Sequence, residues 1–410
     1  MTDLADLHTS VADFEVRDGC LCIGGRKITD IVGEHGSPIY LYDRSLIEKR
    51  VQALKAITPD RVKLHYAIKA NPMPEIVELL STLVDGLDIA SGGELEVALR
   101  TRCPPVDMSF AGPGKSITEL EAAIGAGVTI NVESPTELGR IAEIAARRGQ
   151  RPSIAVRVNP DFELKSSGMK MSGGPKQFGI DAEAVPDILA RIADAPVRLV
   201  GFHVFTGSQN LRPNAICEAH TNALRLALEL ADSATGPLRF INIGGGLGIP
   251  YFPGDTPLEL REIARNLRQL ASELPDHDPQ CALVLELGRY LVGEAGVYVC
   301  TITDRKISRG QIFLVTDGGL HHHLAASGNF GQVIRKNYPV AIANRIGSTE
   351  SENVSIVGPL CTPLDILADR MDLARADVGD LVAVFQSGAY GFSASPHGFL
   401  SHPPPRQLLI

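Results

Sequence analysis

The chain lacks the features that would assign it to nucleic-acid or membrane binding. Its 410 residues carry 39 Lys+Arg against 48 Asp+Glu, a net charge of −9, and no run of basic residues. This balance argues against a nucleic-acid partner and against binding to an anionic membrane surface. The first residues, MTDLADLHTS, contain no basic segment followed by an apolar one, and no apolar run approaches the ~20 residues of a membrane span. We therefore expect a cytoplasmic enzyme that acts on a small molecule.

Cysteine is sparse and scattered. The seven cysteines, an odd number, favour reduced thiols over a disulfide framework. Cys20 and Cys22 lie two residues apart in DGCLCIGG, but no second pair and no histidine partner stands at the spacing of a zinc site. We therefore expect no metal ion.

Most of the chain alternates short β-branched runs with amphipathic stretches. Hydrophobic residues make up 44% of the sequence, which is enough for a large core. Residues 39–292 contain eight predicted strands, among them VKLHYAIKA and ALVLELGRYLVG, and the stretches between them have apolar residues at helical spacing. This alternation predicts an α/β fold, a (β/α)8 barrel of the TIM type.

The two ends of the chain have a different pattern. After residue 292, short alternating runs such as AGVYVCTITDRKIS and GDLVAVFQSGAYGFS follow one another without long helices, and the N-terminal run FEVRDGCLCIGGRKI has the same character. We predict a second, all-β domain of residues 293–410, to which the N-terminal segment 1–38 contributes. Residues 39–292 form the predicted barrel domain.

Polar residues gather at the predicted C-terminal ends of the barrel strands, where TIM barrels carry their active sites. Lys69 ends the apolar run HYAIK, and a Gly-Gly-Gly run ends another strand. A single lysine there is usually solvated or paired, and a single glycine run is usually a turn. The run GGGLG matches neither a Walker loop nor a GxGxxG dinucleotide fingerprint. The same rim receives Asp88, Glu133, Arg157, Asn159, His203, Ser208, Glu286 and Arg289.

Together these groups fit one cofactor, pyridoxal 5'-phosphate. Glycine amides and an arginine suit a phosphate, and a lysine can form an imine with an aldehyde. A carboxylate can hold a ring nitrogen in its protonated form. The combination therefore predicts an enzyme that depends on pyridoxal phosphate (PLP).

Over nearly its whole length the chain resembles the fold-type III PLP decarboxylases, which include diaminopimelate, ornithine and arginine decarboxylases and are similar in their barrel to alanine racemases. The resemblance rests on ten segments in the same order: HYAIKANP, GLDIASGGELE, FAGPGKS, INVESPTEL, VRVNP, GFHVFTGSQ, INIGGGLG, LELGRYLV, VGPLC and GDLVAVFQSGAYGFS. It implies a Schiff base on Lys69 and a carboxylate, Glu286, at the pyridine nitrogen. The cofactor-binding residues that it implies are Lys69, Asp88, Arg157, His203, Phe205, Ser208, Gly244, Gly245, Gly246, Glu286, Gly288, Arg289 and Tyr390.

The resemblance also implies a homodimer with shared active sites. Cys361 of the partner subunit would reprotonate the substrate at Cα, and Tyr390 would complete the site. Glu286 favours decarboxylation over racemisation, because an acid beside the ring nitrogen keeps the ring protonated and electron-withdrawing. The competing interpretations are that Cys361 is a small hydrophobic residue and that Tyr390 fills the core.

Three departures from the family concern the substrate. Thr362 stands where relatives have an acid that pairs with the substrate's distal ammonium, and a neutral hydroxyl cannot neutralise that charge. The stretch GGLHHHLAASGNFGQVIRKNYPV replaces the family's pocket for a distal carboxylate. Phe205 stands at the position of the ring-stacking histidine, and His203 lies two residues earlier. The predicted substrate residues are Thr362, Asp365 and Tyr390.

These departures resemble the exosortase-associated or carrier-protein-linked branch of the family. We therefore expect a decarboxylase of an amino acid without a free distal ammonium, for which an acyl-carrier protein is a candidate partner. The alternatives are a diaminopimelate decarboxylase of lysine biosynthesis and a PLP-binding protein without catalysis, although such proteins stop at the barrel. The run His321-His322-His323 does not favour a metal site, because consecutive residues of a strand point to opposite faces.

Overall fold

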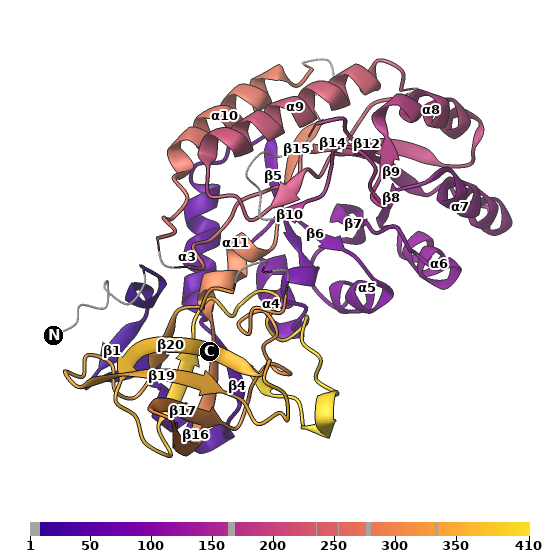
Figure 1. The fold of residues 1–410 in the computed structure, drawn as a ribbon. Coiled ribbons are helices and arrows are strands. Elements are labelled where there is room, and N and C mark those ends of the chain that lie inside the picture. Colours follow the sequence, from indigo (N-terminus) through magenta and orange to yellow (C-terminus); the bar gives the residue numbers. More distant parts are fainter. Residues whose placement is uncertain are drawn as a thin grey trace. The chain divides into compact units, whose positions relative to one another are not determined.

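The computed structural model describes residues 9–162, 169–234, 236–252, 254–275, 280–330, 332 and 335–410 (Figure 1). The chain divides into two compact units. We call Val51–Gly248 with Leu258–Gly288 the barrel unit, and Met1–Arg50, Ile249–Pro257 and Arg289–Ile410 the β unit. In the part of the chain that is described, no helix is both long and apolar enough to cross a membrane.

The barrel unit is built on a closed ring of parallel strands. These are β5 (Val62–Ala67), β6 (Gly86–Ile89), β7 (Met108–Phe110), β8 (Thr129–Val132), β9 (Ser153–Asn159), β12 (Arg198–His203), β14 (Phe240–Asn242) and β15 (Ala282–Leu287). The order β9-β12-β14-β15-β5-β6-β7-β8 closes through the pairing of β8 with β9. The predicted (β/α)8 barrel is therefore confirmed.

Helices lie on the outside of this ring (Figure 1). They are α4 (Pro74–Ser81), α5 (Gly92–Ala98), α6 (Ile117–Ala126), α7 (Pro135–Arg148), α8 (Val185–Asp194), α9 (Pro213–Ala231) and α10 (Leu260–Glu273), and α3 (Arg44–Lys55) precedes β5. As the sequence predicts, α10 is amphipathic and buries Ile263, Leu267 and Leu270. The unit also contains the short strands β10 (Met169–Lys170), β11 (Ile180–Asp181) and β13 (Gly207–Ser208).

Three successive helices begin with the same capping pattern. The hydroxyl oxygens of Ser91, Ser116 and Ser134 each accept a hydrogen bond from the backbone N–H of a glutamate three residues later. Such caps satisfy N–H groups that have no partner inside a helix. They fix where α5, α6 and α7 begin, and so fix the turns that leave the C-terminal ends of β6, β7 and β8.

The β unit combines both ends of the chain. Its strands are β1 (Glu15–Arg17), β2 (Cys20–Ile23), β3 (Arg26–Lys27), β4 (Ile39–Tyr42), β16 (Gly296–Ser308), β17 (Gln311–Thr316), β18 (Val340–Ile342), β19 (Ser351–Val357), β20 (Ile366–Ala374), β21 (Leu381–Val384) and β22 (Arg406–Leu409), with the helices α2 (Ile28–His35) and α11 (Arg289–Val292). N-terminal β4 pairs with β16 and with C-terminal β22. The predicted β-domain from both chain ends is confirmed.

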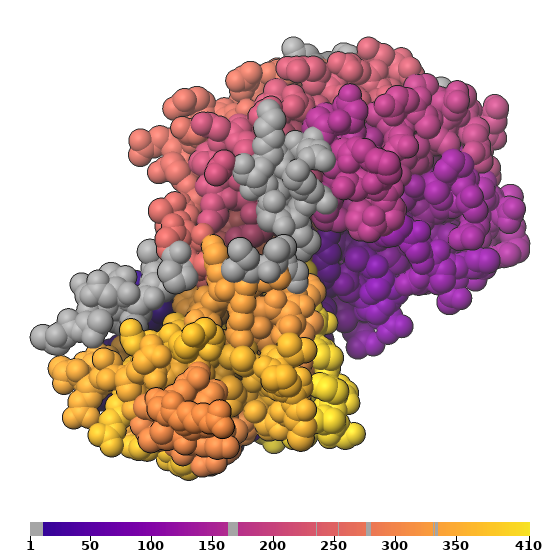
Figure 2. Space-filling model, viewed as in Figure 1, coloured from indigo at the N-terminus to yellow at the C-terminus, as the bar shows by residue number. Residues whose placement is uncertain are grey.

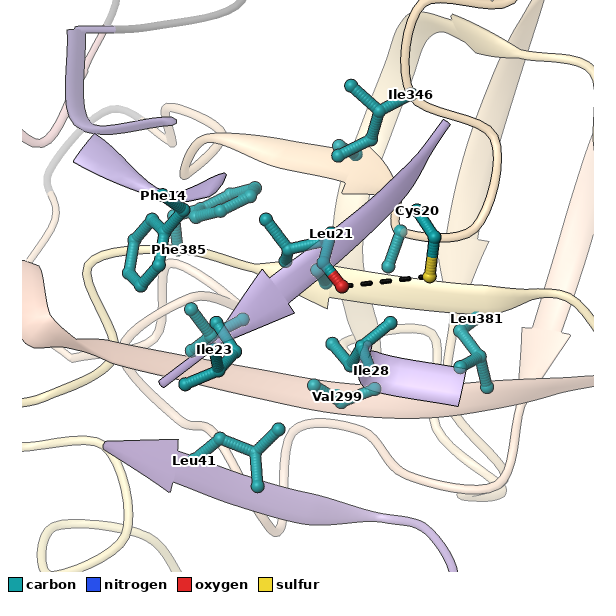
Figure 3. Packing of buried hydrophobic residues seen from close by; sticks show 14 of the residues in the cluster. Phe14, Cys20, Leu21, Ile23, Ile28, Leu41, Val299, Ile346, Leu381 and Phe385 are labelled. Carbon is teal, nitrogen blue, oxygen red and sulfur yellow. Dashed lines mark hydrogen bonds between the residues drawn. The ribbon is translucent and has the colours of Figure 1, made fainter. Parts of the chain in front are cut away.

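A continuous apolar cluster holds these N- and C-terminal strands together (Figure 3). Phe14 packs against Phe385, with ring centroids 5.7 Å apart, and Leu21, Ile23 and Val299 are fully buried. The surface of the β unit seen in Figure 2 comes mainly from its C-terminal residues, drawn in orange to yellow, whereas β2 and β4 are buried along their whole length. The N-terminal segment is therefore part of the core of this unit.

Candidate active site

Lys69 lies directly beyond β5, in a short 3-10 helix (Ile68–Ala70) at the C-terminal end of the barrel. Its Nζ donates a hydrogen bond of 3.0 Å to Oε1 of Glu286, and it lies 5.3 Å from the centre of the Phe205 ring. The side chain of Lys69 is 40% exposed. The cation that ends this buried strand is therefore directed to a buried carboxylate and remains accessible to a ligand.

Glu286, on β15, is a buried carboxylate of the barrel rim. Its side chain is 5% exposed, and its Oε2 lies 3.1 Å from Nε2 of His203. Burial alone would raise the pKa of Glu286, but the Lys69 ammonium and then His203 outweigh this effect and lower the pKa well below its ordinary value. Glu286 is therefore a carboxylate that stays ionised inside the barrel.

His203 and Phe205 have different surroundings, although both stand at the end of β12. Nε2 of His203 lies 3.1 Å from Oε2 of Glu286, but among the described residues neither buried ring nitrogen of His203 has a partner in hydrogen-bond geometry. Phe205 is nearly buried and lies beside Lys69 Nζ. The His203–Glu286 contact was missing from the sequence prediction; both residues face inward at strand ends that are separated only by β14.

Asp88, on β6, belongs to a polar group deeper in the barrel. Its Oδ1 lies 3.2 Å from Nδ1 of His65 and accepts a hydrogen bond from the Ser109 hydroxyl. Among the described residues, none hydrogen-bonds to its buried Oδ2. Burial alone would lower the pKa of His65, but Asp88 outweighs this effect and the pKa is raised. His65 also lines a cavity of about 360 Å³ with Lys63 and Arg239, at the N-terminal ends of the strands.

Arg157, on β9, is paired with a second carboxylate, Glu133. Arg157 Nη1 donates a hydrogen bond of 2.9 Å to Glu133 Oε1, and the guanidinium lies over the Phe178 ring. Behind them, the fully buried Lys115 ammonium contacts Glu137 Oε1 at 2.9 Å, and Glu137 Oε2 accepts the Glu133 N–H. The sequence prediction gave Lys115 no role. These four charges form a buried network that fixes the ends of β8 and β9.

The glycine run 244–246 forms a tight turn after β14. Gly244 and Gly246 have φ values of 72° and 78°, a region that side-chain-bearing residues rarely adopt. A Cβ on Gly245 would lie 2.1 Å from the Glu286 carbonyl oxygen. His220 Nε2 lies 2.9 Å from the Gly245 carbonyl oxygen. Only glycine therefore fits this turn, in which backbone atoms without side chains lie at the rim next to Glu286.

Two other predicted residues also lie at this rim. A Cβ on Gly288 would lie 2.8 Å from Cβ of Ala70, so Gly288 permits close packing beside the Lys69 turn. Ser208 is on β13, which pairs with β10. The barrel unit thus brings together Lys69, Phe205, His203, Glu286 and the glycine turn.

The remaining predicted site residues belong to the β unit. Arg289 Nη1 donates to the Tyr251 hydroxyl at 2.9 Å, and the guanidinium carbon lies 4.7 Å from the centre of the Tyr390 ring. The buried Arg289 Nε has no hydrogen-bond partner among the described residues. Tyr390 has a φ of 55° and is partly exposed. Cys361 is exposed, and Thr362 is partly buried beside it.

Two predictions about the β unit need correction. Asp365 was expected to contact substrate, but its carboxylate is 2% exposed and accepts the backbone N–H groups of Leu320 and Leu360, so both of its oxygens are engaged. The run His321-His322-His323 was treated as part of a strand, but it lies in a turn after Gly318-Gly319, and all three rings are buried. Burial lowers the pKa of His321 to about 3.

The residues present fit pyridoxal phosphate. The partly exposed amine of Lys69 is accessible to an aldehyde, with which it can form an imine. Glu286 is an ionised carboxylate that can pair with a protonated ring nitrogen. The glycine turn is a cradle that a single Cβ would fill. A barrel with a lysine, a buried carboxylate and a glycine turn at its C-terminal rim defines a barrel enzyme of the PLP-dependent type.

Comparison with known proteins agrees with this class. Residues 44–293 match the family described as pyridoxal-dependent decarboxylase, pyridoxal binding domain. The chain therefore belongs to the pyridoxal-dependent decarboxylases: it is a PLP-dependent carboxy-lyase, and pyridoxal 5'-phosphate is its cofactor.

Many known proteins are similar to the chain, and three of them match it along nearly its full length. The L-glutamyl-[BtrI acyl-carrier protein] decarboxylase of Niallia circulans is 36% identical, over 93% of this chain and 91% of that protein. The diaminopimelate decarboxylase of Aquifex aeolicus is 32% identical, over 93% and 89%. The crystal structure of diaminopimelate decarboxylase from M. jannaschi is 27% identical and superimposes with a TM-score of 0.87, over 98% of this chain and 93% of that one.

The buried His220 generates a prediction about pH. Burial lowers the pKa of His220 to about 4, so the folded barrel binds this proton more weakly than the unfolded chain. The contribution of neutral His220 to the free energy of unfolding is therefore fully present above the ordinary histidine pKa of about 6.5. It is lost as the pH falls from about 6.5 to 4 and amounts to roughly 3 kcal/mol. His220→Gln keeps a donor for the Gly245 carbonyl but cannot titrate. It should flatten the pH dependence of unfolding free energy, measured by urea denaturation at pH 7.5, 6, 5 and 4.

His35→Gln, at a partly exposed position on α2, is the matched control and should keep the slope of the wild-type protein. An unchanged slope in His220→Gln would show that His220 does not titrate during unfolding in this range.

Proposed function

We propose that residues 39–292 bind the cofactor, with Lys69 as the residue that holds its aldehyde covalently and Glu286 as the carboxylate for its ring nitrogen. The Lys69–Glu286 contact of 3.0 Å inside the family-matched segment carries this proposal. Bound pyridoxal phosphate supplies an electron sink for the electrons that remain when CO2 leaves the substrate. Because Glu286 stays ionised, it favours the protonated ring and so strengthens that sink.

The other rim residues have supporting roles in this proposal. His203 holds one oxygen of Glu286 in place, and Phe205 offers an aromatic face beside Lys69. The backbone of the 244–246 turn, Gly288, Ser208 and Arg289 serve the phosphate. Asp88 and Arg157 are proposed to support the cofactor through their pairs, because the first is bound to His65 and the second to Glu133.

We propose that Cys361 is the acid that returns a proton to the substrate's Cα, and that it acts with Tyr390 in the site of a partner subunit in a homodimer. Cys361 is exposed, on a loop between β19 and β20. An exposed thiol that is presented by a loop is accessible to a second chain. Such an arrangement makes the dimer the active unit, because each site then needs residues of both chains.

We propose that the substrate lacks a free distal ammonium, and that it is an amino acid carried as an acyl group on an acyl-carrier protein. Thr362, beside Cys361, offers only a hydroxyl, and that hydroxyl already accepts the Leu364 N–H at 3.3 Å. The carrier-protein glutamyl decarboxylase of N. circulans is more similar to this chain, at 36% identity, than the diaminopimelate decarboxylase of A. aeolicus, at 32%. The glutamyl substrate has no distal ammonium, which agrees with a neutral residue at 362.

The alternative substrate is free diaminopimelate. It is favoured by the whole-length similarity to diaminopimelate decarboxylases, including the structure from M. jannaschi. An enzyme of this kind would have to recognise the distal ammonium with residues other than Thr362.

The covalent role of Lys69 can be tested by reduction. Borohydride treatment of the purified holoenzyme should fix the cofactor to the peptide that contains Lys69, and Lys69→Ala should abolish that adduct, because no amine remains beside Glu286. Peptide mass spectrometry measures the adduct. Lys63→Ala removes an exposed lysine from the same strand and should leave the adduct intact. An adduct that persists at the wild-type level in Lys69→Ala would contradict the assignment.

The substrate proposal can be tested at Thr362. An unpaired ammonium in a desolvated site costs roughly 3–5 kcal/mol, or a hundredfold or more in rate. The wild-type enzyme should therefore have a much higher kcat/KM for carrier-linked L-glutamate than for free meso-diaminopimelate. Thr362→Glu should shift this ratio toward diaminopimelate by at least about tenfold, as measured by CO2 release.

Thr362→Gln has a side chain of the same length without the charge and is the matched control; it should not shift the ratio toward diaminopimelate. If the wild-type enzyme prefers free meso-diaminopimelate, the carrier-linked substrate is wrong and the alternative is favoured.

A further inference from the structure

Asp365 stands at the end of the loop that presents Cys361. Its Oδ1 accepts the Leu320 N–H at 2.5 Å, and its Oδ2 accepts the Leu360 N–H at 2.8 Å. Leu360 is the residue immediately before Cys361. The carboxylate therefore holds the peptide group that leads into the proposed catalytic cysteine, and it joins this loop to the turn that follows β17.

The loop closes on itself around the same residue. The Gly358 N–H donates to the Asp365 carbonyl oxygen at 3.1 Å, and the Asp365 N–H donates to the Thr362 carbonyl oxygen at 3.2 Å. The Thr362 N–H donates to the Leu360 carbonyl oxygen at 2.8 Å. Two residues before Cys361 and two after it are thus tied together by hydrogen bonds around a buried carboxylate.

Two glycines make room for this carboxylate. A Cβ on Gly319 would lie 2.2 Å from Asp365 Oδ1, and a Cβ on Gly358 would lie 2.4 Å from Oδ2. Both glycines have ordinary φ values, so the close approach, and not the backbone conformation, requires glycine at these positions. Glycines from two separate segments of the β unit therefore leave room for the carboxylate of Asp365.

We propose that Asp365 is a positioning residue that fixes the Cys361–Thr362 loop for catalysis. The inference rests on the proposed role of Cys361 as the acid for Cα. An aspartate suits this position because both backbone groups that face it are donors, and a carboxylate offers only acceptors. An asparagine would set its own NH2 against one of the two N–H groups and leave that buried donor without a partner.

In its proposed role Cys361 delivers a proton to Cα, and the carbon that receives the proton reports how well this acid is placed. A proton at Cα gives the amine product and regenerates pyridoxal phosphate. If solvent instead protonated the cofactor carbon that had carried the aldehyde, water would hydrolyse the C=N bond at Cα, and an aldehyde and pyridoxamine phosphate would leave. The pyridoxamine phosphate formed per CO2 released therefore measures how well the acid is placed. A misplacement of about 1 Å can cost ~10²-fold in the rate of such a step.

The experiment compares the wild-type holoenzyme with Asp365→Asn, Gly358→Ala and Cys361→Ala. Gly358→Ala moves the Asp365 carboxylate but keeps it as a charged group. This variant therefore tests the inference if Asp365→Asn fails to fold. Asp372→Asn, at an exposed position on β20, is the matched control. The readouts are the ratio of pyridoxamine phosphate to CO2, the cofactor content, and hydrogen exchange of peptides that contain Leu320 and Leu360.

Asp365→Asn and Gly358→Ala should raise the ratio at least about tenfold and lower kcat, with the cofactor content and KM unchanged. Hydrogen exchange should accelerate in the Leu320 and Leu360 peptides and stay unchanged in β16 and β21. Asp372→Asn should behave like the wild-type enzyme.

Two results would overturn the inference, and they can be told apart. If Cys361→Ala raises the ratio but folded Asp365→Asn and Gly358→Ala do not, then Asp365 does not position the loop, and the role of Cys361 stands. If Cys361→Ala itself leaves the ratio at the wild-type value, then the proposed role of Cys361 fails and the inference about Asp365 fails with it.

Discussion

The candidate site depends on one buried carboxylate, Glu286, which is held between Lys69 and His203. An ionised carboxylate that is withdrawn from water costs several kcal/mol unless partners replace its hydration. Lys69 supplies a charge at 3.0 Å and His203 a ring nitrogen at 3.1 Å. The three side chains come from the ends of three different strands, so the closed ring of the barrel is what brings them together.

Other charged residues, at the rim and deeper in the barrel, are paired in the same manner. Arg157 and Glu133 form one buried pair, Lys115 and Glu137 form another, and His65 and Asp88 form a third. Removing one partner of such a pair leaves the other charge buried without a counter-charge. Each pair therefore restricts the position of the strand that carries it.

Local patterns in the sequence predict much of this architecture. The strand–helix alternation, the amphipathic helices and the strand ends that carry Lys69, Asp88, Arg157, His203 and Glu286 all follow from short-range periodicity. The sequence does not predict which of these residues contact each other, because His203 and Glu286 lie on strands that are not neighbours in the ring. Lys115 was also missed, because a lysine in a glycine-rich loop usually lies in solvent and here it is fully buried.

The loop around Cys361 was harder to interpret for a similar reason. Asp365 looks like a substrate-binding acid in the sequence, but its partners include the N–H of Leu320, which is 45 residues away. The histidine run was treated as a strand although Gly318 and Gly319 lie just before Leu320 and His321 and allow a turn. The contacts of Asp365 are long-range and involve the backbone, which no side-chain pattern reveals, whereas the turn at the histidine run depends on its two neighbouring glycines.

The central claim, that the charge of Glu286 makes this barrel rim a decarboxylase site, is tested most directly by CO2 release from Glu286→Gln with its bound cofactor measured in the same samples. Glutamine keeps the size of the side chain but cannot favour a protonated ring. We predict that Glu286→Gln still binds pyridoxal phosphate and that its CO2 release, on carrier-linked glutamate or on diaminopimelate, falls by about 10²-fold or more, close to 3 kcal/mol of transition-state stabilisation. Wild-type rates of CO2 release in a fully loaded Glu286→Gln enzyme would contradict the account.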